Sequence, residues 1–491
     1  MDSRRILKGD YYEKIPYSDY LRRQEAPEAC YDIRDYGAEP GTLSTEAIQK
    51  ALDDAGKEGG TVLVSGGVYL SGTVSVPSGV TLFISEDAVI KAFPDPSLFR
   101  SAFITVRDAE DVTITGGGVI DGQGELFCYP PRKEPLLKPL GYTRLQVPPI
   151  DPMGYPEGTT RFHYRERIRY AEDKYNEGKP NLPRPLYMLW VRGSRNVRLS
   201  NLVLRDSFSW TVSLDCSEDI TAEDIVIDNN RHVANTDGID IMGSERVRIR
   251  NCFISTADDG LCIKAPLREG HDSIEMEDLP MKGASDIEIS GCTVMTVMNA
   301  FKIGTETYHD IARVHVHDCL FLLPDIFPGS VSGISIESAD GSRVSDITVE
   351  DIRMHRVQCP LFICLNRRNK FGCGKTGSVE RITIRNIKAE EAEVPSIVTG
   401  LPGLPLRNIM IDSLDVRYVD NEAELNVVRY ENYDEYPESN ALGDAPAYGL
   451  YARHIDGVSV KELKVKGRSS ETREMLLLED VTRAQAPGPC P

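Results

Sequence analysis

Hydrophobic positions along this chain recur in pairs that are separated by five residues. In each pair an aliphatic residue follows polar or charged positions, and a second small apolar residue comes five positions later. Between the pairs, apolar and polar side chains alternate over short β-rich stretches, which is the pattern of strands with one buried face. The offset occurs nine times: Val197 and Leu202, Ile220 and Ile225, Val247 and Cys252, Ile287 and Cys292, Val314 and Cys319, Ile347 and Ile352, Ile382 and Ile387, Ile409 and Leu414, Val458 and Leu463.

The distance from one pair to the next indicates the architecture. The shortest spacings are 23 and 27 residues, and the longer ones contain inserted loops. A repeat of this size, with short strands and no helix, predicts one coil of a parallel β-helix, whereas a propeller blade needs about 40 residues and four strands. Equivalent residues of stacked coils lie about 4.8 Å apart. We therefore predict an all-β fold in which repeated side chains pack as columns in the core.

Three regions depart from this repeat. Apolar residues at 47, 48, 51, 52 and 55 have helical spacing, and we expect this helix to cap the open N-terminal end of the coils. Residues 123–183, with a possible helix over 162–175, and residues 420–451 read as loop insertions, the first folded against the functional cleft. The expected organisation is an N-terminal extension at 1–29, one β-helix catalytic domain at 30–480 and a C-terminal tail at 481–491.

Composition narrows the partners and the compartment. The net charge of −20 disfavours nucleic acid, because a negative surface repels a phosphate backbone. No stretch approaches 18 apolar residues, so we expect no membrane span. The first residues contain no apolar signal region, and the eleven cysteines suit buried, reduced thiols. We expect a cytoplasmic protein, or a secreted one if a signal peptide had been removed.

Four successive coils can be aligned on their internal register, and the alignment gathers three aspartates. Asp237 and Asp259 occupy the same position, just before the strand, one coil apart, and Asp258 precedes Asp259. The column formed by Ile241, Ile263, Ile303 and Ile336 is predicted to be core, so the column formed by Asp237, Asp259, Asn299 and Ser332 lies at the surface turn.

Three neighbouring carboxyl groups repel one another, so one titrates high and serves as an acid while the others act as bases. Hydrolysis of a glycosidic bond needs this division of labour. Two other interpretations stay open at this point. Aspartate is common at turns without any catalytic role, and clustered carboxylates also bind Ca²⁺.

These residues resemble glycoside hydrolase family 28, the polygalacturonase-like family of the pectate-lyase-like β-helix superfamily. The resemblance implies a single-stranded right-handed parallel β-helix and inverting, metal-free hydrolysis of an oligosaccharide without a cofactor. Asp258 would be the general acid, Asp237 and Asp259 would hold and deprotonate water, and Asn235 would orient sugar or water. It rests on residues 235–240, 256–260 with 263–264, and 207–210, and more widely on 35–38 and 59–62.

The sequence departs from the family where the substrate is bound. The family's Gly-His-Gly is replaced by Met298, Asn299 and Ala300, and its Arg-Ile-Lys by Ser335, Ile336 and Glu337. We expect a rebuilt substrate site and an exo-acting enzyme for pectin-type or related plant oligosaccharides. The alternatives are a Ca²⁺-dependent polysaccharide lyase and a non-catalytic glycan-binding β-helix. The candidate substrate-binding residues are Asn235, Asn299, Lys302, Glu306 and Glu337.

Overall fold

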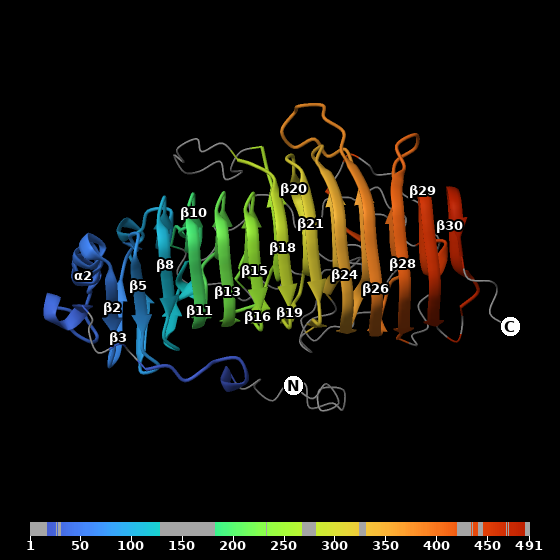
Figure 1. Cartoon of the computed structure of the whole chain (residues 1–491). Helices are drawn as coiled ribbons and strands as arrows, with labels where there is room; N and C mark the ends of the chain where they lie inside the picture. The colour runs from blue at the N-terminus through green and yellow to red at the C-terminus, as the bar shows by residue number, and fades with distance from the viewer. Residues whose placement is uncertain are drawn as a thin grey trace.

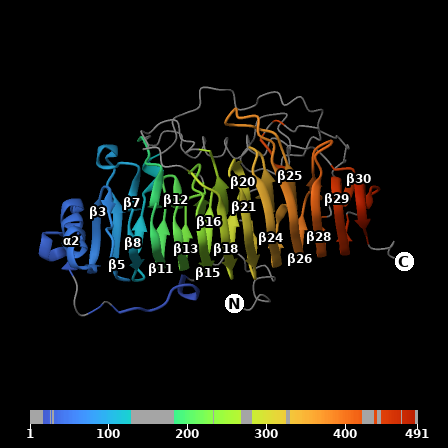
Figure 2. The same ribbon diagram turned by 45° about the horizontal axis from the view of Figure 1, so that its top comes forward.

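The computed structural model shows one elongated stack of coils between Tyr31 and Gln485 (Figures 1 and 2). The possible helix at 162–175 and most of both predicted insertions lie outside the described residues. The structure describes residues 17–25, 27, 31–127, 182–231, 233–267, 281–323, 330–419, 434, 436–439, 445–467, 469 and 471–486.

Strands pair in parallel with the strands one coil earlier and later, and they form three rows along the stack. The first row contains β4 (Val74–Ser75), β7 (Ala102–Arg107), β10 (Tyr187–Arg192), β12 (Trp210–Asp215), β14 (Ile239–Met242), β17 (Leu261–Ala265), β20 (Asn299–Thr307), β23 (Ser330–Ser338), β25 (Val357–Leu365), β27 (Ser396–Thr399) and the first part of β29 (Ala447–Lys466).

The second and third rows share several long strands that turn from one row into the next. The second row contains β1 (Tyr31–Asp32), β2 (Gly60–Val64), β5 (Val80–Ile84), β8 (Glu110–Thr115), β15 (Glu245–Arg250), β18 (Ala284–Ser290) and β21 (Ile311–His317). The third row contains β3 (Gly67–Ser71), β6 (Ala88–Ala92), β9 (Val119–Asp121), β16 (Phe253–Thr256), β19 (Thr293–Thr296) and β22 (Leu320–Leu322). Both rows include parts of β11 (Arg195–Arg205), β13 (Glu218–Asp228), β24 (Arg343–His355), β26 (Ser378–Ala392), β28 (Leu406–Tyr418) and β29.

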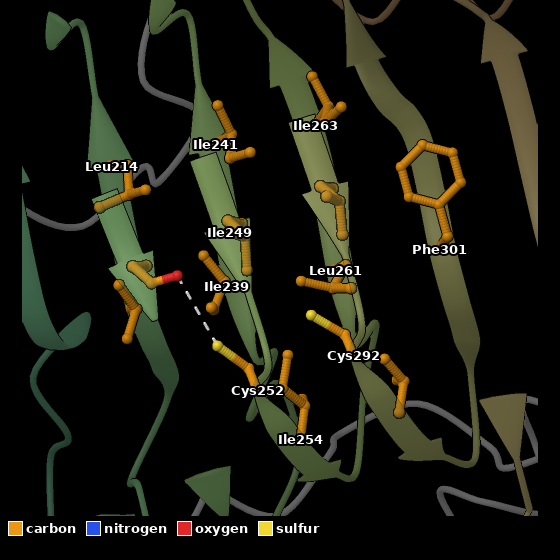
Figure 3. Close-up of a cluster of buried hydrophobic side chains, with 14 of the residues drawn as sticks. Leu214, Ile239, Ile241, Ile249, Cys252, Ile254, Leu261, Ile263, Cys292 and Phe301 are labelled. Carbon is orange, nitrogen blue, oxygen red and sulfur yellow. Dashed lines mark hydrogen bonds between the residues drawn. The ribbon is translucent and has the colours of Figure 1, made fainter. Parts of the chain in front are cut away.

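The predicted hydrophobic columns are confirmed by the strand register. The first member of every pair, from Val197 to Val458, is aligned with the first member of the next coil. All nine are at most 2% exposed. Figure 3 shows the same stacking for Ile241 beside Ile263 and for Cys252 beside Cys292. β-Branched side chains fill such a pleated, repetitive core well, which explains why valine and isoleucine dominate it.

The predicted capping helix is confirmed as α2 (Thr45–Glu58), at the N-terminal end of the stack (Figure 1). Its buried residues are the five apolar positions of the sequence pattern, and it packs beside β2, β4 and β5. The helix ends at Glu58. The next residue, Gly59, has a φ of 80°, which lies outside the range of a right-handed helix. The helix therefore covers the first edge of the hydrophobic core, which stacked coils cannot cover themselves.

The two ends of the described chain contact the β-helix in different ways. Residues 17–25 lie against the third row, where Tyr20 packs on Val203, Val226 and Phe253 and donates a hydrogen bond to Thr293. The last strand, β30 (Glu474–Gln485), pairs with β29 and so continues the coils past residue 480. Within the described ranges, no helix has the length and apolar character needed to cross a membrane.

Candidate active site

The aspartates of the site stand at turns that the coil register fixes. The amide of Gly238 donates to the carbonyl of Asp259 at 2.9 Å, so the turn before β14 stacks on the turn before β17. A Cβ atom at Gly238 would lie 2.3 Å from the carbonyl oxygen of Gly260. Only glycine permits this approach, which explains why Asp-Gly occurs in both turns. The register thus makes the two aspartates neighbours, as the sequence alignment predicted.

Three carboxylates gather at one cavity on the outer face of the first row. One carboxylate oxygen each from Asp237, Asp258 and Asp259 lies within 4.8 Å of the others. Asp237 and Asp259 are buried, whereas Asp258 is partly exposed. The cavity has a volume of about 170 Å³. Its other lining residues are Trp210, Asn235, Met242, Lys264, Pro266, Glu306, Lys370 and Tyr436.

Asp258 is held by amide groups. The side-chain amide of Asn235 donates to Asp258 Oδ2 at 3.3 Å, and the backbone amide of Asp259 donates to Asp258 Oδ1 at 2.9 Å. Asn235 has a φ of 56°, a left-handed conformation that asparagine tolerates well. Its side-chain oxygen accepts a bond from Arg184 at 3.2 Å. Asn235 therefore lines the cavity and also orients the candidate acid.

Asp237 shares a buried cation with a fourth carboxylate, Asp240. Lys264 Nζ lies 3.3 Å from Asp237 Oδ2 and 2.5 Å from Asp240 Oδ1. The same ammonium stands 3.8 Å from the ring centroid of Trp210. Burial and then the charge of Asp240 raise the pKa of Asp237 well above its usual range, and burial raises the pKa of Asp240 to about 7. A raised pKa makes the Asp237 carboxylate a stronger base once it is ionised.

Asp259 lies in a separate network of buried groups. Asn299 donates to Asp259 Oδ1 from its backbone amide at 3.1 Å and from its side chain at 2.8 Å. Lys302 Nζ lies 3.4 Å from Asp259 Oδ2 and 3.1 Å from Glu438 Oε1. Sequence reasoning singled out Asn299 and Lys302 but missed Glu438 and Tyr436. These two residues belong to an insertion that has no repeat register, so no local pattern pointed to them.

The two remaining candidates, Glu306 and Glu337, occupy different environments. Glu306 lines the cavity and forms ion pairs with Lys370 at 3.0 Å and Arg368 at 3.5 Å. Although burial alone would raise it, the charges of Lys370 and Arg368 lower the pKa of Glu306 to about 2. Glu337 is fully buried, accepts a hydrogen bond from Ser335 at 2.6 Å and is not among the described residues that line the cavity.

Glu337 should give the protein a measurable pH dependence. Burial raises the pKa of Glu337 to about 8, from an ordinary value of 4.5. The folded state therefore binds this proton more tightly than the unfolded chain, so the contribution of Glu337 to stability falls as the pH rises between these two values. We expect Glu337→Gln to reduce this fall in the free energy of unfolding. Urea unfolding at about pH 5 and about pH 8 measures it. If the free energy of unfolding changes with pH as in the wild type, the raised pKa of Glu337 is contradicted. Glu462→Gln, at an exposed ion pair, is the control.

Comparisons with known proteins place this site in a family. The profile of "Glycosyl hydrolases family 28" matches residues 168–432, more than half of the chain. A probable polygalacturonase of Vitis vinifera is 26% identical over 443 residues, which cover 83% of this chain and 78% of the relative. An endo-polygalacturonase of Pectobacterium carotovorum subsp. carotovorum is 27% identical over 366 residues, which cover 69% and 75%.

Solved structures share the fold. The family 28 exopolygalacturonase of Yersinia enterocolitica superimposes with a TM-score of 0.65 at 17% identity, over 95% of this chain and 80% of that chain. A hyperthermoactive exopolygalacturonase of Thermotoga maritima gives a TM-score of 0.60 at 20% identity, over 82% and 90%. This chain belongs to glycosyl hydrolase family 28 and is a glycosidase built on a right-handed parallel β-helix.

Proposed function

We propose that the enzyme hydrolyses glycosidic bonds of pectin-type oligosaccharides from a chain end, with inversion at the anomeric carbon. The observation that carries this proposal is the meeting of Asp237, Asp258 and Asp259 at one cavity, where each has a different environment. The Vitis and Pectobacterium relatives are named a probable polygalacturonase and an endo-polygalacturonase, which supports a pectic substrate.

The proposed reaction contains two proton transfers, one to the glycosidic oxygen and one from the attacking water. Asp258 donates its proton to the glycosidic oxygen as the bond to the anomeric carbon breaks. A water molecule held by Asp237 and Asp259 attacks that carbon from the opposite face, and its proton passes to one of these carboxylates. Asp258 suits the acid role because it is partly exposed and Asn235 orients it. Asp237 suits the base role because Lys264 Nζ lies 3.3 Å from its Oδ2, so that a buried ammonium opposes the rise in pKa that burial causes.

Retention is the second candidate outcome, and one distance favours it. Inverting enzymes usually separate their two carboxyl groups by about 6.5–9.5 Å, whereas retaining enzymes hold them about 5 Å apart. In this trio, one oxygen from each carboxylate lies within 4.8 Å of the others. In a retaining mechanism, Asp237 or Asp259 would attack the sugar directly. We favour inversion because Asp237 and Asp259 together offer two acceptor oxygens that can hold a water beside the acid. The anomer of the first product distinguishes the two mechanisms.

Action from a chain end is supported by the wall of the cavity. Tyr436 lines the cavity and Glu438 is buried next to it, and both come from the segment between β28 and β29. Trp210 and Lys370 form further parts of the wall. Ser335 and Glu337 stand where the family has an Arg and a Lys that bind the substrate. Lys370 lines the cavity and keeps 38% of its side chain exposed, so it is the cation best placed to contact an acidic sugar.

Defined pectic oligosaccharides test the proposal directly. We expect release of one terminal sugar with the mass of a hydrolysis product, no absorbance from a conjugated double bond, and full activity in EDTA. NMR of the first product should show the inverted anomer. An unsaturated product that forms only with Ca²⁺ would establish a lyase, for which the three clustered carboxylates would hold the ion. Saturable binding of a glycan without turnover would establish a binding protein instead.

A further inference from the structure

The segment 436–439 is attached to the catalytic coils although it lies outside the part that matches the family profile, which ends at residue 432. Ser439 holds it on β23, because its hydroxyl donates to the carbonyl of Val331 at 3.2 Å and accepts from Ser332 at 3.1 Å. Glu438 and Ser439 are both buried. The segment is therefore packed against β23 and is not a solvated surface loop.

Glu438 and Asp259 are joined by two shared donors. Lys302 Nζ lies 3.1 Å from Glu438 Oε1 and 3.4 Å from Asp259 Oδ2. The side-chain amide of Asn299 donates to Asp259 Oδ1 at 2.8 Å and to Glu438 Oε2 at 3.5 Å. Each carboxylate thus uses both of its oxygens in the pair of bridges. This arrangement fixes the rotation of the Asp259 carboxylate as well as its position.

The buried ammonium group makes the second carboxylate necessary. Lys302 is fully buried, and the ring centroid of Tyr436 lies 5.3 Å from its Nζ. Although burial lowers it, the charges of Asp259 and Glu438 raise the pKa of Lys302 well above its usual range. A buried ammonium with a single acidic partner is poorly compensated. Glu438 supplies a second partner, so Lys302 is held between two carboxylates rather than drawn to Asp259 alone.

We propose that Glu438 is a positioning residue for Asp259, acting through Lys302 and Asn299, so that residues 436–439 complete the catalytic apparatus. The inference rests on the base role of Asp259 in the proposed function. Glu438 lies outside the part of the chain that the family profile matches. The other titratable groups with an electrostatic influence on Asp259 or a place beside it are Asp237, Asp240, Asp258, Cys262 and Glu337.

The test compares charge-changing variants at this pair. Glu438→Gln keeps the size of the side chain and removes its charge. We expect kcat to fall roughly 10²-fold with little change in KM, since misplacement of a catalytic group affects the chemical step. The acid limb of the kcat/KM profile should move to lower pH, because Lys302 then acts on Asp259 alone. Glu438→Asp should restore part of kcat, and Glu462→Gln, at an exposed glutamate, is the matched control.

A double variant should shift the acid limb of the kcat/KM profile in the opposite direction. Such a shift can be measured only in a folded, active protein, so it also controls for loss of folding. Lys302→Met with Glu438→Gln removes both buried charges, so the acid limb should move to higher pH than in the wild type. A purely structural role would not produce shifts in opposite directions. Wild-type kcat and pH profile in Glu438→Gln, or a change in KM alone, would overturn the inference. Asp258→Asn is measured in parallel: if it retains turnover, the proposed function fails, and if it is inactive while Glu438→Gln is normal, only this inference fails.

Discussion

Asp258→Asn is expected to lower kcat by about 10²–10⁴, the usual contribution of a positioned general acid. The amide has the shape of the carboxyl group but cannot give a proton to the leaving oxygen. Because Asp258 is partly exposed, the folded protein should lose little stability. The measurement is kcat on the best pectic oligosaccharide, together with thermal unfolding followed by circular dichroism.

The choice of leaving group separates an acid from a residue that merely shapes the cavity. An aryl glycoside whose phenolate leaves without a proton should be cleaved by Asp258→Asn with a much smaller loss than the natural bond. Equal losses on both substrates would contradict the acid role. Asp108→Asn serves as the control, since Asp108 is an exposed aspartate with the same left-handed backbone conformation as many turn residues of this fold.

Lys264→Met is expected to have the largest effect on stability. The substitution would leave Asp237 and Asp240 buried without the ammonium that lies between them. Loss of one partner of a buried ion pair costs about 3–5 kcal/mol, because the remaining charge is uncompensated. The free energy of unfolding in urea measures the effect. Lys461→Met, at an exposed ion pair with Asp412, should change it little.

A second substitution tests the electrostatic explanation for Lys264. Asp240→Asn in the Lys264→Met background removes one of the two uncompensated carboxylates, so it should recover part of the lost stability. Independent losses that add together would show that the side chain of Lys264 acts through packing, for instance against Trp210. Recovery would show that Lys264 neutralises the two carboxylates, one of which is the proposed base.

Most of the fold followed from the sequence because stacked coils repeat the same local rule. Val197 and Ile220 occupy the same column in the structure because they occupy the same place in their repeats. The same register predicted that Asp237 and Asp259 would be neighbours. A helical pattern of five small and aliphatic residues was sufficient to locate α2. Each of these features depends on residues that are close in sequence or one repeat apart.

The parts that were not predicted depend on contacts without a repeat. Glu438 reaches Lys302 across 136 positions of sequence, from a segment with no strand pattern of its own. Asp240 belongs to the motif at 235–240 but received no role from it, and only its contact with Lys264 shows that it shares the site's charge. For Glu337, the strand position could be predicted but not the approach of Gly304, where a Cβ atom would lie 2.9 Å from Glu337 Oε2. This close approach belongs to the packing of two coils rather than to either one.

The stacked coils and the loops that connect them can change in sequence and length independently of each other. Asp237, Asp259 and Asn299 each belong to a different coil, and backbone hydrogen bonds between coils set the distance from one to the next. Length added between β9 and β10, or between β28 and β29 outside residues 436–439, leaves that distance unchanged and keeps Glu438 at Lys302. Evolution, or a protein engineer, can therefore exchange the walls of the cavity by insertion and deletion while the reacting groups keep their spacing. Changes of substrate are then accessible through loops, provided that Glu438 keeps its contact with Lys302.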